Sequence, residues 1–355
     1  MPVATYVEAL RQLHHVGGRR RLHGQAGIVA VVEQLQGLEL PAGDWERQIL
    51  SARIADYRPE DLDALCLAGV ITWARLTPRA TPPDERRRAV QHPSAATPLT
   101  LCRREDLPWL LEAARGANHP TPPVAGAAAD CFEALMASGP TFRADLAGLT
   151  GRLPAEVDEG LWELVARGLV HADAYGAVRN LLGGSRRAPG SARHGARSRL
   201  GLHRSGPLGP IGEGRWSIIP NRAEVDRGTV ATEQLAEEVA AQLLLRWGVV
   251  AFEHRARESI TLPWREIMRA LRRMEARGVV AGGRFVAGLS GEQYALADFA
   301  ASLATVDGTG GEAVTVAASD PLNITGHLLP GLRIPGIVNR TVTVSNGEVN
   351  DAARA

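Results

Sequence analysis

The chain has 355 residues, 45% of them hydrophobic, and a formal net charge of +1. This length exceeds that of one ordinary domain, so we expect about two to four domains, and the small net charge gives no global signature of nucleic-acid binding. No apolar run approaches the roughly 18 residues of a membrane span, and residues 1–15 lack the pattern of a secretory signal, so no membrane partner is expected.

All 40 basic residues are arginine, because the sequence contains no lysine. A phosphate-binding loop of the form GxxxxGK[ST] requires its lysine, and no DEAD-like acidic box is present. We therefore expect that this chain alone does not hydrolyse ATP. Cys66, Cys102 and Cys131 form no CxxC pair, and the ten histidines form no HxxxH pattern, so we expect neither a metal nor another cofactor.

One pattern occurs three times along the chain: two apolar residues spaced by three, a glycine four residues later, and then a short apolar stretch. Its members are Leu62, Leu65 and Gly69; Leu161, Leu164 and Gly168; and Leu271, Met274 and Gly278. The spacing is typical of an amphipathic helix that ends at a glycine and turns into a strand. With the helical segments upstream, each copy predicts the last helix and the wing of a winged helix-turn-helix unit.

These units predict an α+β fold of tandem winged-helix domains followed by a small C-terminal β-barrel or sheet. Segments rich in proline, glycine and arginine mark the boundaries between them. We expect a first winged-helix unit at 1–105, a second at 106–183, an Arg/Gly-rich linker at 184–227, a third unit at 228–298 and a C-terminal β domain at 299–355.

The wings and the terminal domain have signals of their own. We expect wing strands at 72–76 and 97–102 in the first unit, within 171–181 in the second and within 283–295 in the third. In the terminal domain, residues 313–318 and 341–345 alternate as strands do. The Asn346-Gly347 pair that follows is the strongest two-residue hairpin signal.

Four segments resemble the C-terminal region of the Lhr family, the large helicase-related proteins of bacteria. They are residues 31–37 (VVEQLQG), 62–73 (LDALCLAGVITW), 214–220 (GRWSIIP) and 318–325 (ASDPLNIT), in the family's order. The resemblance implies a winged-helix array that ends in a β-barrel. In family members, two RecA-like motor domains with ATP-dependent 3′–5′ helicase activity come first. Because the chain opens within a family-like helix, we expect a fragment or a split gene product.

The resemblance also implies partners and a location. We expect DNA, single-stranded or damaged, as the ligand, a helicase motor region on the same or an adjacent gene, and a place in the cytoplasm at the bacterial nucleoid. The leading hypothesis is a DNA-binding C-terminal module of a DNA-repair helicase, without the ATPase motor. The alternatives are a DNA glycosylase that excises uracil or alkylated bases, and an oligomerisation scaffold that forms a homo-oligomer.

The enzyme alternative comes from a similarity in fold to bacterial glycosylases that remove alkylated or cross-linked bases. Those enzymes use a Gln-aliphatic-Gln or Gln-aliphatic-Asp motif, which Gln34-Leu35-Gln36 matches. Uracil removal is also associated with the C-terminal region of Lhr relatives. An amide orients water but is a poor general base, so a carboxylate is needed, and Asp320 is our candidate, with Glu33 and Asp44 as others. The competing interpretation of Gln34 and Gln36 is that they make structural hydrogen bonds. The competing interpretation of Asp320 is that it belongs to an ordered turn.

The candidate DNA-binding groups are arginines of the third unit and of the linker. In the helix expected at 263–277, one outer face holds Arg265, Arg269, Arg272 and Arg273, opposite a buried apolar stripe. Arg186 and Arg187 begin an acid-free basic stretch of the linker. Arg215-Trp216 could clamp a phosphate and stack an unpaired base. The alternative for the helix is an arginine face that only contacts solvent. The alternative for the linker is a soluble tether, and the alternative for Trp216 is a buried core residue.

The equivalent helices of the other two units are acidic. Their carboxylates are Glu60, Asp61 and Asp63 in the first unit and Glu156, Asp158, Glu159 and Glu163 in the second. Such faces repel DNA, so we assign them to contacts between domains or subunits. They are the basis of the scaffold alternative.

Overall fold

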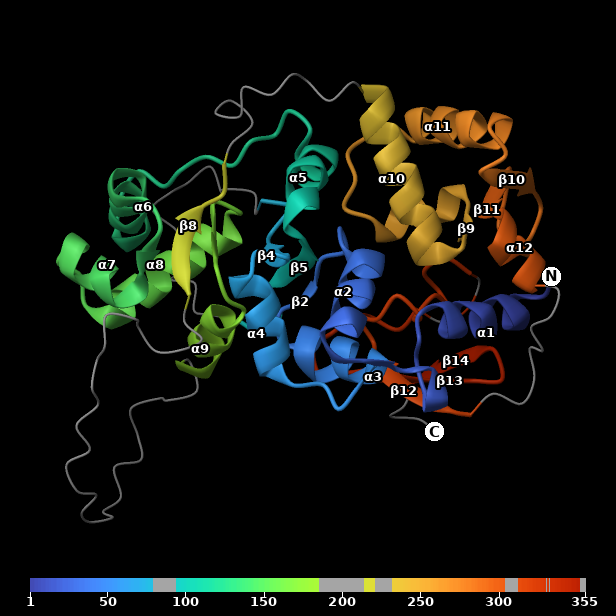
Figure 1. Ribbon diagram of the computed structural model, residues 1–355, viewed down its shortest axis with the longest axis horizontal. Helices are drawn as coiled ribbons and strands as arrows, with labels where there is room; N and C mark the ends of the chain where they lie inside the picture. Colours follow the sequence, from blue (N-terminus) through green and yellow to red (C-terminus); the bar gives the residue numbers. More distant parts are fainter. Residues whose placement is uncertain are drawn as a thin grey trace, which may run out of the picture.

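The computed structural model describes residues 1–78, 94–184, 214–220, 232–303, 312–329, 331 and 333–351. Helices alternate with small two- and three-stranded sheets (Figure 1). The second predicted unit lies at one end of the molecule. The third unit and the terminal sheet lie at the other end, and the first unit lies between them. Within the described residues, no helix is long and apolar enough to cross a membrane.

The three repeat copies end in the same way. Each last helix, α4 (Pro59–Leu67), α8 (Pro154–Ala166) and α11 (Trp264–Ala276), is followed by a glycine with a φ near +70°. After α4, the amide of Gly69 donates to the carbonyl of Cys66 at 3.0 Å, and the amide of Val70 donates to Leu65 at 3.0 Å. This pair of bonds is a Schellman motif, and the same two bonds follow α8 and α11. The predicted helix-glycine-strand pattern is confirmed.

The first unit builds its sheet in the order β2-β5-β4. Its elements are β1 (Leu22–His23), α2 (Gly24–Leu35), β2 (Leu40–Pro41), η2 (Trp45–Leu50), α3 (Ser51–Arg53), β3 (Ile54–Ala55), α4, β4 (Ile71–Ala74) and β5 (Pro98–Arg103). Strands β4 and β5 pair antiparallel, with Trp73 opposite Leu101, so the predicted wing of this unit is confirmed. The short helix η4 (Arg104–Asp106) and α5 (Leu107–Arg115) follow, and α5 packs on the third unit through the Thr261 amide, which donates to Ala113.

The second unit completes its sheet with a strand from far along the chain. Its elements are α6 (Ala127–Ser138), β6 (Thr141–Phe142), α7 (Arg143–Thr150), α8, β7 (Val170–Ala172), α9 (Gly176–Gly184) and β8 (Arg215–Ile218). The wing expected within 171–181 is therefore wrong in its second half, which is α9. The antiparallel partner of β7 is β8, from within the segment that we assigned to the linker. Sequence proximity favoured a local hairpin, but the apolar Trp216 and Ile218 supply the pairing.

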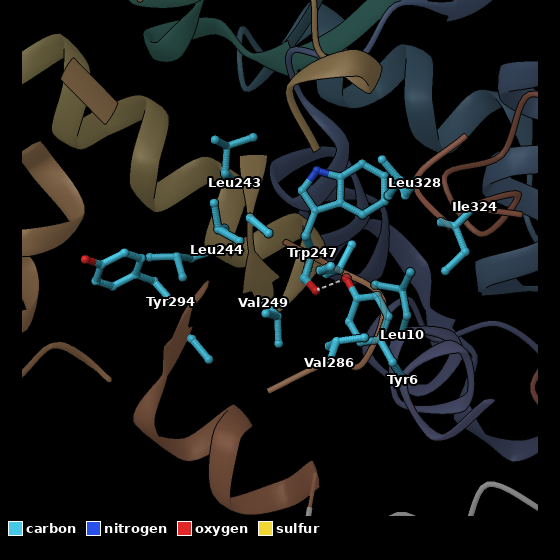
Figure 2. Close-up of a cluster of buried hydrophobic side chains, with 14 of the residues drawn as sticks. Tyr6, Leu10, Leu243, Leu244, Trp247, Val249, Val286, Tyr294, Ile324 and Leu328 are labelled. Carbon is cyan, nitrogen blue, oxygen red and sulfur yellow. Dashed lines mark hydrogen bonds between the residues drawn. The ribbon is translucent and has the colours of Figure 1, made fainter. Parts of the chain in front are cut away.

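The third unit has the strand order β10-β11-β9. Its elements are α10 (Thr232–Trp247), β9 (Val249–Val250), η6 (Phe252–Arg257), α11, β10 (Val280–Gly283), β11 (Gln293–Leu296) and α12 (Ala297–Leu303). Strands β10 and β11 form the wing, with Val280 opposite Leu296. The helix α1 (Val3–Leu13) packs against this unit rather than only against the first: the Tyr6 hydroxyl donates to the carbonyl of Trp247 at 2.9 Å (Figure 2).

The terminal segment forms an antiparallel sheet in the order β12-β13-β14. Its strands are β12 (Val314–Ala317), β13 (Thr341–Ser345) and β14 (Glu348–Asp351). Asn346 and Gly347 both have positive φ, at 49° and 72°, and Ser345 pairs with Glu348, so the predicted hairpin is confirmed. In the described residues the segment is a sheet and not a closed barrel, because β12 and β14 pair only with β13.

Two large apolar clusters hold these parts together. One contains core residues of both the first and second units, including Trp45, Trp73, Trp162 and Trp216. The other joins α1, the third unit and the terminal sheet. Figure 2 shows Tyr6 and Leu10 below Trp247, and Leu328 and Ile324 to the right of its ring. The units therefore share cores and form one packed body.

Gly160 lies where α8 crosses α6. A Cβ atom at this position would lie 2.8 Å from the backbone carbonyl of Ala127, which cannot rotate away. We expect Gly160→Ala to lower the free energy of unfolding by about 1–3 kcal/mol, because the helices must separate. The control is Gly148→Ala in α7, where a Cβ meets nothing within 4 Å. It should stabilise by about 0.5–1 kcal/mol, since alanine is the better helix former. Urea unfolding of both variants measures the difference, and equal effects would contradict the close helix contact.

Candidate nucleic-acid interface

The predicted basic face of α11 is exposed. The side chains of Arg265, Arg269 and Arg272 are 76%, 64% and 60% exposed. Ile267, Leu271 and Met274 on the opposite side are buried, as the apolar spacing predicted. In a winged helix-turn-helix this last helix is the one that enters the major groove of DNA. In Figure 1, α11 lies at the outer edge of the third unit.

The arginines of this face are paired with glutamates. Glu266 accepts from Arg269 at 2.9 Å and from Arg265 at 3.2 Å, and Glu292 of the wing accepts from Arg272 at 2.8 Å. Hydrogen bonds from Arg269 and Arg272 hold the pKa values of Glu266 and Glu292 below their ordinary range, so both carboxylates stay ionised at neutral pH. Exposed ion pairs of this kind contribute about 0–1 kcal/mol, so a phosphate can replace the carboxylate.

Arg273 is less exposed than the other three arginines of this helix and is bonded to another helix. It is 35% exposed and bonds to Glu237 of α10 at 3.2 Å, next to Arg277, which bonds to the same carboxylate at 3.0 Å. The pair ties α11 to α10. Two arginines that we did not predict are exposed on the same unit, Arg255 in η6 and Arg284 in the β10–β11 loop, and neither has an ion pair among the described residues.

The Arg215-Trp216 pair does not form the predicted clamp. Trp216 is 1% exposed and packs edge-on against Trp73, with ring centroids 5.9 Å apart. The alternation of β8 sends the indole into the core and the guanidinium outward, where Arg215 bonds to Asp173 at 3.0 Å. A base cannot stack on this tryptophan. The other predicted linker groups, Arg186 and Arg187, lie outside the described residues.

The acidic helices of the first two units have partners within the chain. Glu156 and Asp158 of α8 pair with Arg152 and Arg143, and Glu163 pairs with Arg167. In α4, Asp61 pairs with Arg58 and Asp63 pairs with Arg179 of α9. Internal pairing therefore accounts for most of these carboxylates, without a partner subunit.

Gln34 and Gln36 lie in a buried polar junction between the first and third units. Both side chains are 5% exposed. The amide of Gln34 donates to the carbonyl of Leu13 at 3.0 Å, and that of Gln36 donates to Asp106 at 2.9 Å and to Gln242 of α10 at 3.1 Å. This placement supports structural hydrogen bonding, which we left open, and not the water-positioning role.

Arg246 of α10 completes this junction. Its guanidinium donates to the carbonyl of Gln36 and forms an ion pair with Glu258, and both side chains are 2% exposed or less. Glu258 also accepts from the indole of Trp247 at 2.8 Å. The cavity beside Gln36, Gln242 and Arg246 holds about 20 Å³, which is room for one water and not for a nucleobase.

Asp320 lies in a second buried network, which joins the terminal domain to the first unit and α1. Its two oxygens accept from Arg53 at 2.8 and 3.0 Å, and neither side chain is exposed. Arg53 also donates to Nδ1 of His14 at 3.2 Å, and Nε2 of His14 donates to the carbonyl of Arg246 at 2.8 Å. Burial lowers the pKa of His14 to about 3, which keeps the imidazole neutral for this arrangement.

Burial opposes the charge of Asp320, but the charge and hydrogen bonds of Arg53 outweigh it and hold the pKa of this carboxyl below its ordinary value. A carboxylate with both oxygens held by Arg53 cannot also activate water. Asp320 is therefore placed as a structural ion, and the predicted catalytic role is not supported. Nearby, Asp44 is 1% exposed and accepts from the Ser319 hydroxyl at 2.7 Å.

Arg53 was not among the functional residues that the sequence predicts. Arg53 follows apolar Ile49 and Leu50 and precedes Ile54, a setting that indicates a buried arginine, but its partner lies 267 residues away and could not be found from spacing. No group of three or more His, Cys, Asp or Glu that could hold a metal occurs among the residues that the structure describes.

The buried pair gives a stability prediction. Asp320→Asn should lower the free energy of unfolding by about 3–5 kcal/mol, because Arg53 would keep a buried and uncompensated charge. The control Asp61→Asn removes the partner of Arg58, whose side chain is 72% exposed, and should cost at most about 1 kcal/mol. Urea unfolding followed by circular dichroism compares them. Equal small losses would contradict a structural role for Asp320.

The buried histidines give a pH prediction. Burial lowers the pKa to about 3 for His14 and to about 4 for His171 and His254, below the value of about 6.5 in an unfolded chain. Their contribution to stability is therefore complete above about pH 6.5 and is lost as the pH falls toward 4. As the pH falls through that window, each of the three histidines should lower the free energy of unfolding by about 1.4 kcal/mol per pH unit. His171→Gln should reduce the slope between pH 6 and pH 5 by about this amount, and an unchanged slope would refute the assignment.

Comparisons with known proteins agree with this architecture. Two families, both described as "Large helicase-related protein, winged-helix domain", match residues 1–91 and 229–314. The chain is 28% identical over 352 residues to the "Lhr helicase/uracil glycosylase" of Escherichia coli strain K12, and 30% identical over 347 residues to the "Lhr helicase/ probable uracil glycosylase" of Mycolicibacterium smegmatis. Each match covers 92% of this chain and 21% of the relative, so the chain spans about a fifth of their length. The chain belongs to the Lhr, or large helicase-related, family and matches a C-terminal region of its members.

Proposed function

We propose that this chain is a DNA-binding module of an Lhr-type repair helicase, and that its third unit contacts DNA through α11. The single observation that carries the proposal is the exposed face of Arg265, Arg269 and Arg272 on the last helix of a winged helix-turn-helix. Arg255 in η6 and Arg284 in the β10–β11 loop add exposed positive charge to the same unit. These groups would contact phosphates, so binding would be electrostatic and weak in sequence preference.

The module would act together with a helicase motor. Both relatives are named as helicases, and each is about five times longer than the part that this chain matches. We propose that a motor region on the same or an adjacent gene supplies ATP-driven movement, and that this chain holds the DNA. The shared cores of the units support such a role, because they fix α11 relative to the rest of the array.

Salt dependence tests the electrostatic contact. With about four to six phosphate contacts, log K should fall against log salt with a slope of roughly −3 to −5. Arg265→Gln combined with Arg269→Gln should reduce the magnitude of that slope by about 1.4–1.8, at roughly 0.7–0.9 for each lost contact. Fluorescence anisotropy of a labelled oligonucleotide at several salt concentrations measures both values.

The matched control also loses two positive charges, but outside the third unit. Arg58→Gln combined with Arg152→Gln removes two arginines from the first and second units, where α4 and α8 are acidic. This control should leave the salt slope nearly unchanged. A slope that falls equally in both double variants would mean that net charge, and not α11, determines binding. No binding at low salt would refute the proposal.

A second candidate function is excision of uracil from DNA. It is supported by the names of both relatives and by one observation: a cleft of about 350 Å³ lies between the first and second units. A cleft of this volume is in the range of ligand pockets, and its lining includes Glu46 and Tyr175. An excised base must leave the stack and enter such a pocket.

Abasic-site formation on uracil-containing single-stranded DNA, in single-turnover mode, tests the second candidate. If the glutamine motif orients water, Gln36→Ala should lower the rate about ten-fold or more while DNA affinity is preserved. If the cleft holds the base, Glu46→Gln should have the larger effect. No excision by the unaltered chain would remove the enzymatic candidate and leave the DNA-binding proposal intact.

A further inference from the structure

An exposed aromatic pair lies beside the basic face of α11. Phe252 is the first residue of η6, and 52% of it is exposed. Its ring meets that of Trp264, the first residue of α11, edge to face, with centroids 5.8 Å apart and an interplanar angle of 82°. Trp264 packs partly on the apolar core, whereas Phe252 belongs to none of the core clusters of the described residues. The tryptophan thus orients a phenyl ring that contributes little to the interior.

Arginines follow both aromatic residues along their elements, η6 and α11. Residues three apart eclipse each other in a 3₁₀ helix, so Arg255 stands on the same face of η6 as Phe252. Arg255 is exposed and has no ion pair among the residues that the structure describes. On α11, Arg272 and Arg265 follow Trp264 around the helix by about 80° and 100°. Arg265 and Arg272 are paired with Glu266 and Glu292, and Arg272 lies about 12 Å farther along the helix axis than Trp264. Arg255 is therefore the cation beside the aromatic pair that has no ion pair among the described residues.

The carboxylates nearest in sequence are already engaged. Glu253 accepts through Oε1 from the backbone amide and the hydroxyl of Ser290, at 2.8 and 2.5 Å, and its Oε2 is buried without a hydrogen-bond partner among the described residues. Glu258 is held by Arg246 and Trp247 in the buried junction. Glu266 bonds to Arg265 and Arg269 on the far side of α11. None of these carboxylates pairs with Arg255, so its guanidinium remains available for an anion.

We propose that Phe252, supported by Trp264, is a stacking platform for an unpaired nucleobase, and that Arg255 contacts the phosphate of the same nucleotide. This inference rests on the proposed DNA-binding function and narrows its ligand to a single strand. A half-exposed ring with an adjacent guanidinium fits both parts of a nucleotide, its apolar face and its anionic phosphate. Paired bases within a duplex are stacked on each other, and their faces cannot reach the ring. The platform therefore distinguishes a single strand from a duplex, which the arginines of α11 alone do not.

The experiment compares two probes on the full chain: a labelled single-stranded oligothymidine and a duplex of the same length. Phe252→Ala should weaken single-strand binding roughly five- to hundred-fold and change duplex binding by no more than about two-fold, since stacking on an aromatic ring acts on unpaired bases. Phe252→Tyr keeps an aromatic face and should retain the affinity. Leu67→Ala, at a residue of α4 that is 57% exposed, is the matched control and should have no effect on either probe.

Arg255→Gln provides a second and independent readout. It should reduce the magnitude of the salt slope for the single strand by about 0.7, the value for one phosphate contact. Circular dichroism and thermal unfolding establish that each variant is folded, which the exposure of both residues favours.

Two outcomes would overturn the platform. Unchanged single-strand binding in Phe252→Ala, while Arg265→Gln with Arg269→Gln still weakens binding, would leave the α11 contact standing and remove the stacking contact. Equal losses on single strand and duplex would show that Phe252 only positions the arginines. If the unaltered chain binds neither probe, the proposed function fails together with this inference.

Discussion

Arg53 and Asp320 form an ion pair that has no contact with solvent, and the arrangement of the other units depends on it. Two charges this deeply buried are tolerated only when each satisfies the other, and here both carboxylate oxygens are used. The pair fixes the turn after β12 against α3. His14, bonded to Arg53 on one side and to the Arg246 carbonyl on the other, brings α1 and the end of α10 to the same point. Four segments of the chain, at residues 14, 53, 246 and 320, therefore meet at one polar centre.

The junction around Gln36 extends this constraint to the third unit. Arg246 and Gln242 of α10 bond to the end of α2, so the third unit cannot rotate freely about the first. Buried polar groups require specific partners, whereas apolar surfaces can slide past each other. The apolar cluster packs α1, the third unit and the terminal sheet together. The hydrogen bonds of Arg246 and Gln242 fix the position of α10 relative to α2. As a result, α11 presents its arginines from a rigid body.

Local structure could be predicted from the sequence, and long-range partners could not. Glycines 69, 168 and 278 each follow an apolar pair at fixed spacing, which is enough to predict a helix end and a strand. Asn346-Gly347 likewise specifies its hairpin. The pairing of β7 with β8 was missed because its two strands are more than forty residues apart, and local hairpins are the simpler expectation. For the same reason, the sequence around Trp216 is compatible with a stacking residue, whereas the structure packs this side chain against Trp73.

The candidate site shows the same division. The exposed arginines of α11 follow from helical periodicity. The partner of Arg272 on the wing, Glu292, and the partner of Arg273 on α10, Glu237, come from tertiary structure. Gln34 and Gln36 are candidates because they match the glutamine motif of glycosylases, and Asp320 is a candidate because the motif needs a carboxylate. The same residue types also serve as buried structural groups. Only their depth and partners separate the two classes. Phe252 gave no sequence signal, because its significance lies in its exposure and in the neighbouring Trp264.

Hydrogen exchange measured by mass spectrometry, with and without a single-stranded oligonucleotide, tests the central claim most directly. If the third unit is the DNA-binding surface, amide exchange should slow in η6, in α11 and in the β10–β11 loop, and should stay unchanged in α4 and α8. Protection of α4 or α8 without protection of α11 would contradict the account, because it would place the nucleic acid on the acidic faces of the first two units.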